Sequence, residues 1–194
     1  MPEPLQAGDG LLIVDVQNDF CPGGALPVPE GDAVVPVLNT WIRAARDAGI
    51  PVYASRDWHP PDHISFQPRG GPWPPHCIQD TPGAAFHPDL ELPEDAVIIS
   101  KGQSPERDQY SAFDGTGLGQ RLQKAGIKRL WVGGLAQDVC VRASVIDGAR
   151  EGFAVHLIRP ATRPVEAQGG DGDRALEDMQ EAGAIVETQA EPGR

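Results

Sequence analysis

The chain has 194 residues, of which 40% are hydrophobic and 23% are charged, a balance typical of a soluble globular protein. Its formal net charge of −12 disfavours nucleic acid and anionic membranes as partners, because both carry negative charge. We find no run of about 18 apolar residues and no basic, apolar leader before residue 10, so we expect neither a membrane span nor a secretion signal.

The three cysteines, Cys21, Cys77 and Cys140, are an odd number in a chain without a secretion signature. This favours reduced thiols and a cytoplasmic location. The length fits one domain over residues 1–194, with enough chain to bury a core without disulfide support.

Continuous apolar runs indicate strands that are buried on both faces of a parallel sheet. Six such runs occur, at 11–16, 52–55, 96–100, 130–133, 154–158 and 184–187. Apolar residues at helical spacing, followed in each case by a glycine, predict helices between them, at 34–45, 118–125, 140–151 and 173–182. This alternation predicts an α/β fold of three layers, α/β/α, around a doubly wound, mostly parallel six-stranded sheet of Rossmann-like type. In such sheets the ligand site lies beyond the carboxyl ends of the strands.

Residues 56–95 depart from this pattern. The segment is rich in proline and glycine, has no clear period, and contains four of the five histidines: His59, His63, His76 and His87. A loop of this length within a compact domain is usually functional. We therefore expect a functional loop here, inserted into the single domain.

Cys140 follows the predicted strand at 130–133 and should lie near the start of the next helix. The helix dipole and its free N–H groups favour a thiolate there, and the same N–H groups can stabilise an oxyanion. The alternative is a buried cysteine that only fills space, and Cys140 alone does not decide between the two.

Two further residues stand at strand ends and favour the catalytic interpretation. Asp15 ends the apolar run at 11–16, where a buried carboxylate needs a partner and is placed to take a proton from a thiol. Lys101 directly follows the strand at 96–100, whereas Lys124 and Lys128 fall on or after a surface helix. Asp15 could instead cap a turn, although Asp19 suits that role better, and Lys101 could be solvated. The three strand ends together favour an acid, a cation and a thiol in one site.

The histidine loop carries a separate signal. Asp57 and His59 lie two residues apart directly after a strand, and His76 follows in Trp73-Pro74-Pro75-His76-Cys77. One carboxylate and two imidazoles leave positions open for water and substrate, as a catalytic metal site requires. His63 is a candidate for a fourth ligand or a supporting contact. Isolated loop histidines are usually surface residues, but this pattern within one irregular loop favours a metal.

These residues resemble the nicotinamidases (pyrazinamidases) of the isochorismatase-like cysteine hydrolase superfamily, in order, spacing and residue type. The matching segments are Ile13-Val14-Asp15-Val16-Gln17-Asn18-Asp19-Phe20, Gly23-Gly24-Ala25-Leu26, Asp57-Trp58-His59-Pro60, His63-Ile64-Ser65-Phe66, Trp73-Pro74-Pro75-His76-Cys77, Lys101-Gly102, Tyr110-Ser111-Ala112-Phe113 and Gly134-Leu135-Ala136-Gln137-Asp138-Val139-Cys140-Val141. The resemblance implies hydrolysis of nicotinamide, or of pyrazinamide-like amides, to the acid and ammonia in NAD salvage, through a cysteine thioester. It also implies an isochorismatase-like fold and, in many members, dimers or larger assemblies.

The resemblance further implies a role for each matching residue. Cys140 would be the nucleophile, Asp15 the general base and later acid, and Lys101 the cation that orients them. The N–H groups of Ala136 and Cys140 would form the oxyanion hole, with a cis peptide bond just before Ala136. The remaining roles are a divalent metal, most often zinc but also iron or manganese, held by Asp57, His59 and His76, and a substrate pocket formed by Phe20, Trp73, Tyr110 and Ala136.

Other functions would explain part of this residue pattern. Another hydrolase of the same superfamily, such as a carbamoyl-amide or ureide hydrolase, would share Cys140, Asp15 and Lys101, but such enzymes generally lack the Asp-x-His and Pro-His metal pattern. A related metal-dependent cysteine amidohydrolase that acts on another small amide is the main alternative. A true isochorismatase would lack the cysteine. A metal-binding module without catalysis would explain the histidines but not the three residues at strand ends. Val139 stands where some nicotinamidases have histidine, so we expect a different pocket wall there.

Overall fold

The computed structural model describes residues 3–193, and its centre is a sheet of six strands that are all parallel. The strand order is β3-β2-β1-β4-β5-β6. The strands are β1 (Asp9–Val14), β2 (Val52–Asp57), β3 (Val97–Lys101), β4 (Arg129–Leu135), β5 (Ala154–Arg163) and β6 (Ile185–Glu187). The predicted six-stranded α/β architecture is confirmed, and the sheet is wholly rather than mostly parallel.

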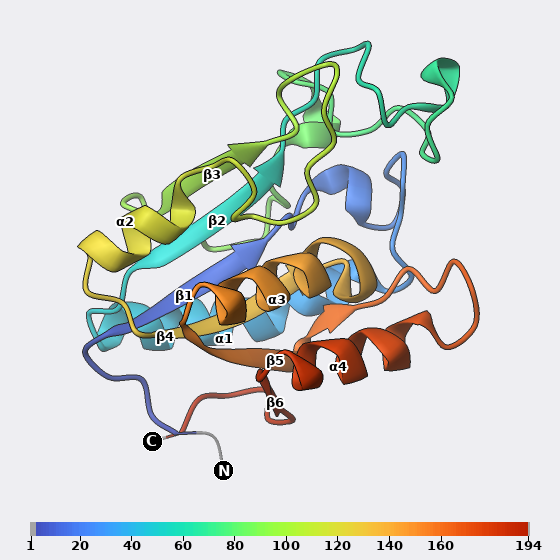
Figure 1. Cartoon of the computed structure of the whole chain (residues 1–194). Coiled ribbons are helices and arrows are strands. Elements are labelled where there is room, and N and C mark those ends of the chain that lie inside the picture. The colour runs from blue at the N-terminus through green and yellow to red at the C-terminus, as the bar shows by residue number, and fades with distance from the viewer. Residues whose placement is uncertain (1–2, 194) are drawn as a thin grey trace.

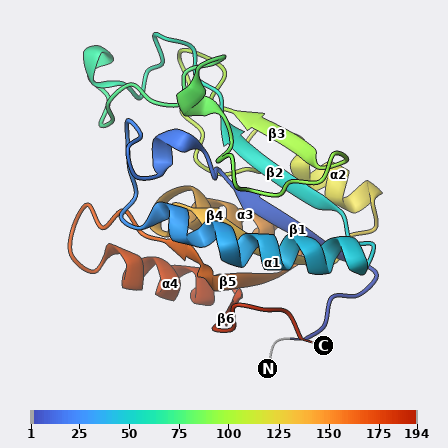
Figure 2. The same cartoon turned by 180° about the vertical axis from the view of Figure 1, so that it is seen from behind.

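Helices cover both faces of the sheet (Figures 1 and 2). The helix α1 (Val34–Asp47) lies alone on one face, where Leu38 and Trp41 are fully buried against the sheet. The other face carries α2 (Leu118–Lys124), α3 (Arg142–Arg150) and α4 (Asp171–Glu181). Their apolar sides bury Leu122, Val145 and Met179 in a second core. Two apolar cores therefore sandwich the sheet, which explains why its strands read as continuous apolar runs.

The chain begins in the middle of the sheet, moves outward through β2 and β3, and then returns to place β4 on the other side of β1. The carboxyl ends of β1 and β4 therefore form the point where the direction of winding reverses, which is where ligands bind in open α/β sheets. Gly134 allows the two strands to pair closely at this point. Its φ is +127°, and a Cβ atom would lie 2.1 Å from the Val14 carbonyl oxygen, so only glycine fits.

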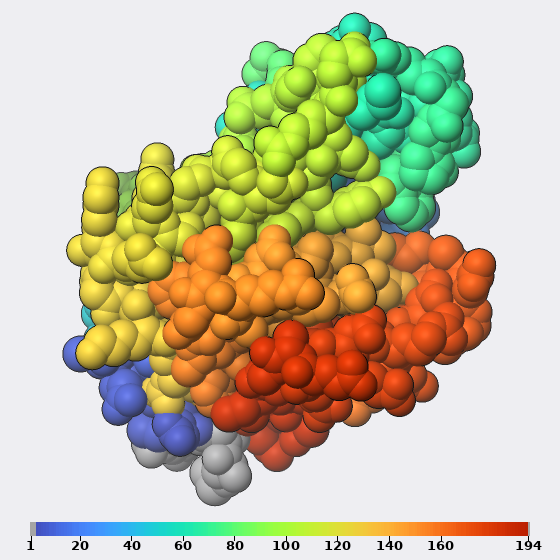
Figure 3. Space-filling view, viewed as in Figure 1, coloured from blue at the N-terminus to red at the C-terminus, as the bar shows by residue number. Residues whose placement is uncertain are grey.

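Beyond this edge of the sheet, the segments that follow β2 and β3 form a lobe at one end of the molecule (Figure 3). It is irregular apart from the short 3₁₀ turns Gln67–Arg69 and Pro82–Ala84. It contains most of the loop predicted over residues 56–95, whereas Asp89 and Glu91, near the end of that loop, are hydrogen-bonded to Asn39 of α1. Within residues 3–193, no helix has both the length and the apolar character needed to cross a membrane.

The predicted strands and helices occur in the predicted order. The start of the third helix and the end of the fifth strand differ from the prediction. The third helix was expected to start at Cys140, but a π-helical turn, Gln137–Val141, precedes α3, which begins at Arg142. The fifth strand continues to Arg163, five residues past the apolar run, because β4 and β5 resume pairing after an irregularity between Val132 and Gly134.

Candidate active site

Asp15, Lys101 and Cys140 meet at the carboxyl ends of β1, β3 and β4. The Lys101 Nζ atom lies 2.7 Å from Asp15 Oδ2 and 3.4 Å from Cys140 Sγ, and its side chain is inaccessible to solvent. It also contacts Asp57 Oδ1 at 2.5 Å. A carboxylate oxygen of Asp15, one of Asp57 and the Cys140 sulfur all lie within 4.8 Å of one another. The acid, cation and thiol that the sequence places at three strand ends are thus brought together.

Asp15 is held in an unusual backbone conformation directly after β1. Its φ is +48°, in the left-handed region that non-glycine residues rarely adopt, and its backbone N–H donates to the Ser55 carbonyl at 3.1 Å. The Ser55 hydroxyl donates to Asp15 Oδ1 at 2.7 Å, which leaves Oδ2 for Lys101. The carboxylate is fully buried and directed into the cluster.

Burial and the neighbouring charges set the protonation of this cluster. Burial raises the pKa of Asp15, with the Asp57 carboxylate adding to the effect and Lys101 opposing it. Burial alone would raise the pKa of Asp57 as well, but Lys101 and the two histidines hold it well below its usual range. Burial would lower the pKa of Lys101, yet Asp15 and Asp57 keep it well above its ordinary value. Lys101 is therefore a permanent cation, and Asp15 is the stronger proton acceptor of the two carboxylates.

The expectation that a helix N-terminus lowers the pKa of Cys140 is wrong for this arrangement. Burial, together with Asp15 and Asp57, raises the pKa of this thiol well above its ordinary value, although Lys101 opposes the shift. Cys140 also lies within the π-helical turn rather than in the first turn of α3. The thiol therefore needs a base beside it, because the position alone does not ionise it.

The backbone before Cys140 forms a tight turn that starts at Ala136. The Leu135–Ala136 peptide bond is cis, as the resemblance implies. The Ala136 carbonyl accepts hydrogen bonds from the N–H groups of Val139 and Val141, both at 3.1 Å, which closes the turn that carries Cys140. Ala136 and Cys140 are both buried and line the same pocket.

Asp57, His59 and His76 form a second cluster, which adjoins the first through Asp57. The Asp57 Oδ2 atom lies 3.5 Å from His59 Nε2 and 3.7 Å from His76 Nε2, and all three residues are buried. One ligand-type atom from each residue falls within 4.8 Å of the others. Such a set of one carboxylate and two imidazoles can hold a divalent cation.

The hydrogen bonds of the two imidazoles test whether this set fits a metal. His59 Nδ1 pairs with the Gly102 carbonyl at 2.8 Å, and His76 Nδ1 pairs with the Pro74 carbonyl at 2.8 Å. Because a carbonyl oxygen only accepts, each Nδ1 carries a proton and donates it, so Nε2 is the nitrogen of each ring that faces Asp57 Oδ2 and is available to a metal. This is the usual arrangement of metal-binding histidines, so the residues fit a metal.

His63 has a different place from the other two histidines. Its ring stacks on that of His59 with centroids 3.9 Å apart. Its Nδ1 is hydrogen-bonded to the Ser65 hydroxyl at 2.7 Å and its Nε2 to the Arg107 carbonyl at 2.9 Å. Both nitrogens therefore have protein partners, and His63 supports His59 rather than joining the ligand set.

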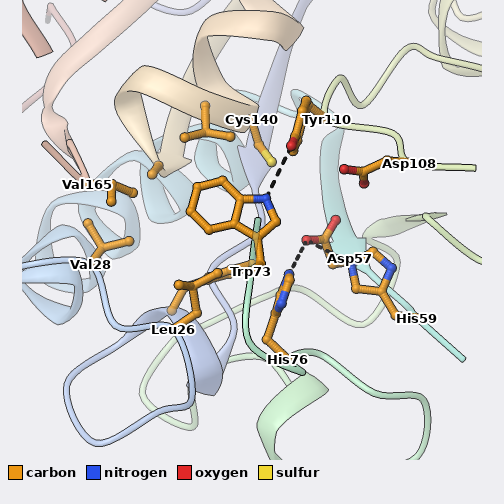
Figure 4. Close-up of a pocket in the computed structure, with 13 residues that line it drawn as sticks. Leu26, Val28, Asp57, His59, Trp73, His76, Asp108, Tyr110, Cys140 and Val165 are labelled. Carbon is orange, nitrogen blue, oxygen red and sulfur yellow. Dashed lines mark hydrogen bonds and ion pairs between the residues drawn. The ribbon is translucent and has the colours of Figure 1, made fainter. Parts of the chain in front are cut away.

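The two clusters meet at one pocket, which Cys140 lines from the first cluster and Asp57, His59 and His76 line from the second (Figure 4). Trp73 lies across it, and its indole N–H donates to the Tyr110 hydroxyl at 3.2 Å. Phe20, 5.6 Å from His76 between ring centroids, lines the pocket as well. The predicted residues Phe20, Trp73, Tyr110 and Ala136 are thus all pocket residues. The apolar wall opposite the metal cluster comes from Leu26, Val28, Val139 and Val165.

Sequence reasoning missed three residues of the site. Gln17 and Ser55 are fully buried and hold Asp57 and Asp15. Gln17 lies within a segment that matches the family, so the sequence marks it as a candidate. The segment does not show which residue its side chain contacts. Asp108 also lines the pocket. The sequence did not mark it as a site residue, apart from its position two residues before Tyr110.

The other two cysteines, Cys21 and Cys77, are buried and free. Burial raises the pKa of Cys21 to about 11, and Asp32 adds to the effect. Burial also raises the pKa of Cys77 well above its ordinary value. Asp19 accepts hydrogen bonds from the N–H groups of Ala25 and Cys77, at 3.0 and 2.8 Å, as expected of a turn-capping residue.

Comparison with known proteins agrees with this geometry. The isochorismatase domain profile matches residues 9–191, which is nearly the whole chain. The chain belongs to the isochorismatase family. The family assignment does not identify the substrate by itself, because a ureidoacrylate amidohydrolase of Methylobacterium radiotolerans is also 30% identical to this chain.

The relatives narrow the assignment. The nicotinamidase of Escherichia coli is 40% identical over 202 residues, which cover 93% of this chain and 95% of that protein. The nicotinamidase/pyrazinamidase of Mycobacterium tuberculosis is 38% identical over 180 residues, covering 89% of this chain and 94% of the relative. The crystal structure of the pyrazinamidase of Pyrococcus horikoshii in complex with zinc superposes with a TM-score of 0.90 at 48% identity, covering 94% and 99% of the two chains. The resemblance inferred from the sequence segments is confirmed.

Proposed function

We propose that this protein is a nicotinamidase, which hydrolyses nicotinamide and related amides such as pyrazinamide to the acid and ammonia, within NAD salvage. The observation that carries the proposal is the junction of two clusters at one pocket: a buried acid–cation–thiol set and a buried Asp–His–His set that share Asp57. Two relatives that are named as nicotinamidases and a crystal structure that is named as a pyrazinamidase support it.

In the proposed reaction, Asp15 takes the proton of Cys140, and the thiolate attacks the carboxamide carbon. The N–H groups of Ala136 and Cys140 stabilise the oxyanion, where one such donor is worth about 3 kcal/mol. Asp15 gives the proton to the leaving ammonia. Water then attacks the thioester with Asp15 as base, which releases the acid and restores the thiol. Lys101 remains charged throughout and keeps the two carboxylates and the sulfur together.

Asp57, His59 and His76 would hold the metal, for which zinc is the first choice and iron or manganese are alternatives. When bound, the metal supplies a Lewis acid to which the ring nitrogen of the substrate can bind. Phe20, Trp73 and Tyr110 form the aromatic walls that would hold the ring. The thiol then meets the carboxamide at the opposite end of the pocket.

The first test measures ammonia release from nicotinamide by the wild type, by Cys140→Ala and by the matched variant Cys21→Ala. We expect Cys140→Ala to lose activity by several orders of magnitude, as removal of a nucleophile does. Cys21→Ala should keep it. No ammonia from the wild type would refute the nicotinamidase proposal, whereas equal rates from wild type and Cys140→Ala would refute only the nucleophile. A panel of small amides, pyrazinamide among them, separates nicotinamidase from an amidohydrolase of other specificity.

The second test concerns the metal. His76→Ala removes a ligand, and we expect its zinc affinity to fall by at least the roughly 10–100-fold that loss of an outer partner costs. The control is His87→Ala, a histidine of the same loop that lies outside the pocket and accepts a hydrogen bond from the Asp89 N–H. Zinc affinity that is equal in the two variants would show that the Asp57, His59 and His76 assignment is wrong.

We also propose a cytoplasmic location and a homo-oligomer. Three free, buried cysteines suit a reducing compartment, and the family resemblance supports assembly. Light scattering coupled to size-exclusion chromatography measures the mass in solution, and a single monomeric peak would contradict the second proposal.

A further inference from the structure

The Asp108 carboxylate lines the pocket and has no use in the reaction described above. Its Oδ1 atom accepts a hydrogen bond from the Gln109 N–H at 3.0 Å, and no ion pair within residues 3–193 includes it. In Figure 4 it lies beside Tyr110 and faces the side of the pocket that holds Asp57 and His59. A partly buried carboxylate without a cation is costly, so its place in the pocket needs a reason.

Both neighbours of Asp108 are tied to the metal cluster. The Arg107 carbonyl is hydrogen-bonded to His63, whose ring stacks on His59. The Gln109 side-chain oxygen accepts from the Gly102 N–H at 2.9 Å, and the Gly102 carbonyl in turn holds His59. The approach is close: a Cβ atom on Gly102 would lie 2.3 Å from His59 Cε1. The backbone on either side of Asp108 is therefore fixed relative to His59.

Asp108 does not belong to the set of ligand-type atoms within 4.8 Å of one another, which is limited to Asp57, His59 and His76 on this side of the pocket. Three protein ligands leave positions that water or substrate fills. A carboxylate that lies just outside the ligand set can accept hydrogen bonds from such water. It also adds negative charge near a divalent cation that would otherwise have one carboxylate beside it.

We propose that Asp108 is an outer carboxylate of the metal site, which anchors the water that completes the coordination of the metal and does not bind the metal itself. This inference rests on the proposed metal site. It makes Asp108 a positioning residue, whose loss lowers metal affinity while the set of protein ligands stays the same.

The experiment measures zinc affinity by competition with a chromophoric chelator, for the wild type, Asp108→Asn and Asp62→Asn. The asparagine keeps the size of Asp108 and an oxygen for the Gln109 N–H, so the loop keeps its fold. Asp62→Asn is the matched control, because Asp62 is exposed on the histidine loop and does not line the pocket. We expect a loss of roughly tenfold or more for Asp108→Asn and no change for Asp62→Asn.

Absorption of the cobalt-substituted proteins separates an outer residue from a ligand. Asp108→Asn should keep the shape of the visible cobalt bands, whereas His76→Ala should change it because a ligand is lost. Wild-type zinc affinity in Asp108→Asn, or an altered cobalt spectrum in that variant, overturns the inference and leaves the metal site intact. A wild type that binds no zinc overturns the metal site and the inference together.

Discussion

One carboxylate, that of Asp57, serves both clusters of the site. Its Oδ1 atom contacts Lys101 and its Oδ2 atom faces the two histidines. The pKa of Asp57 is well below its usual range because Lys101 and the histidines outweigh its burial, so it stays ionised and available to both sides. A substitution in one cluster should therefore change the position or the electrostatic environment of Asp57, and through it the other cluster.

Gln17 is the residue that fixes Asp57. Its Oε1 accepts from the Asp57 N–H at 2.9 Å, and its Nε2 donates to the carbonyls of Asp57 and Ala84 at 2.8 and 2.9 Å. Every polar atom of the buried amide is thus paired, and the backbone of Asp57 is held on both sides.

We expect Gln17→Glu to lower the free energy of unfolding by about 2 kcal/mol or more, because a donor facing two carbonyls becomes an acceptor in a buried site. Urea denaturation measures the change. Gln123→Glu makes the same substitution on the exposed side of α2 and should stay within about 0.5 kcal/mol of the wild type. Equal stability of the two variants would contradict the role assigned to Gln17.

At the level of elements, the sequence predicts the strands and helices well because the central strands β1, β2 and β4 are buried on both faces and contain continuous apolar runs. The start of β1 at Asp9 was missed because a charged residue there looks like a loop, yet Arg129 compensates its charge. The π-helical turn before α3 was missed because its residues also suit an α-helix. Only the cis bond at Ala136, which the resemblance implied, marked that region as unusual.

Gly134 is the position where an element is most sensitive to substitution. Because a Cβ atom there would lie 2.1 Å from the Val14 carbonyl oxygen, Gly134→Ala should force β1 and β4 apart and lower the melting temperature strongly, or prevent folding. Gly169→Ala is the control, since it has open space around it and an ordinary φ. Thermal unfolding followed by circular dichroism compares them, and a Gly134→Ala variant as stable as the control would disprove the close fit.

For the molecule as a whole, the sequence could place residues at strand ends but could not measure their separations. Asp15, Lys101 and Cys140 were predictable because parallel strands bring their carboxyl ends to one edge. His63 was left open because only the structure shows both its nitrogens bound. The place of Asp108 in the pocket could not be predicted from the sequence, because it depends on how an irregular loop packs against His59.

The edge of the sheet opposite the site contains a buried ion pair that affects global stability. Arg129 donates to both carboxylate oxygens of Asp9, at 2.7 and 2.8 Å, and the Trp131 indole N–H donates at 3.2 Å. Burial alone would raise the pKa of Asp9, but the hydrogen bonds from Arg129 hold it below its usual value.

A carboxyl group whose pKa is lower in the folded state than in the unfolded state stabilises the folded protein. For Asp9 this stabilisation is fully present above the pKa of the unfolded state, about 4, and is lost as the pH falls through the pKa of the folded state. We therefore expect Asp9→Asn to lose about 3 kcal/mol of unfolding free energy at neutral pH and progressively less below about pH 4. Urea denaturation across this range tests it. A difference between the two proteins that stays constant down to pH 2 would contradict the assignment.

The winding of the sheet also fixes the order in which the site becomes complete. Asp15, Asp57, His59, His76 and Lys101 all precede β4 in the chain, whereas Cys140 follows it. During synthesis, the residues proposed for the metal and for the base leave the ribosome first, and the proposed nucleophile emerges only after β4, the strand that pairs with β1 at the centre of the sheet. A chain that ends before Cys140 therefore lacks its thiol, so turnover reports that the chain has been made at least through β4 and the turn that follows it.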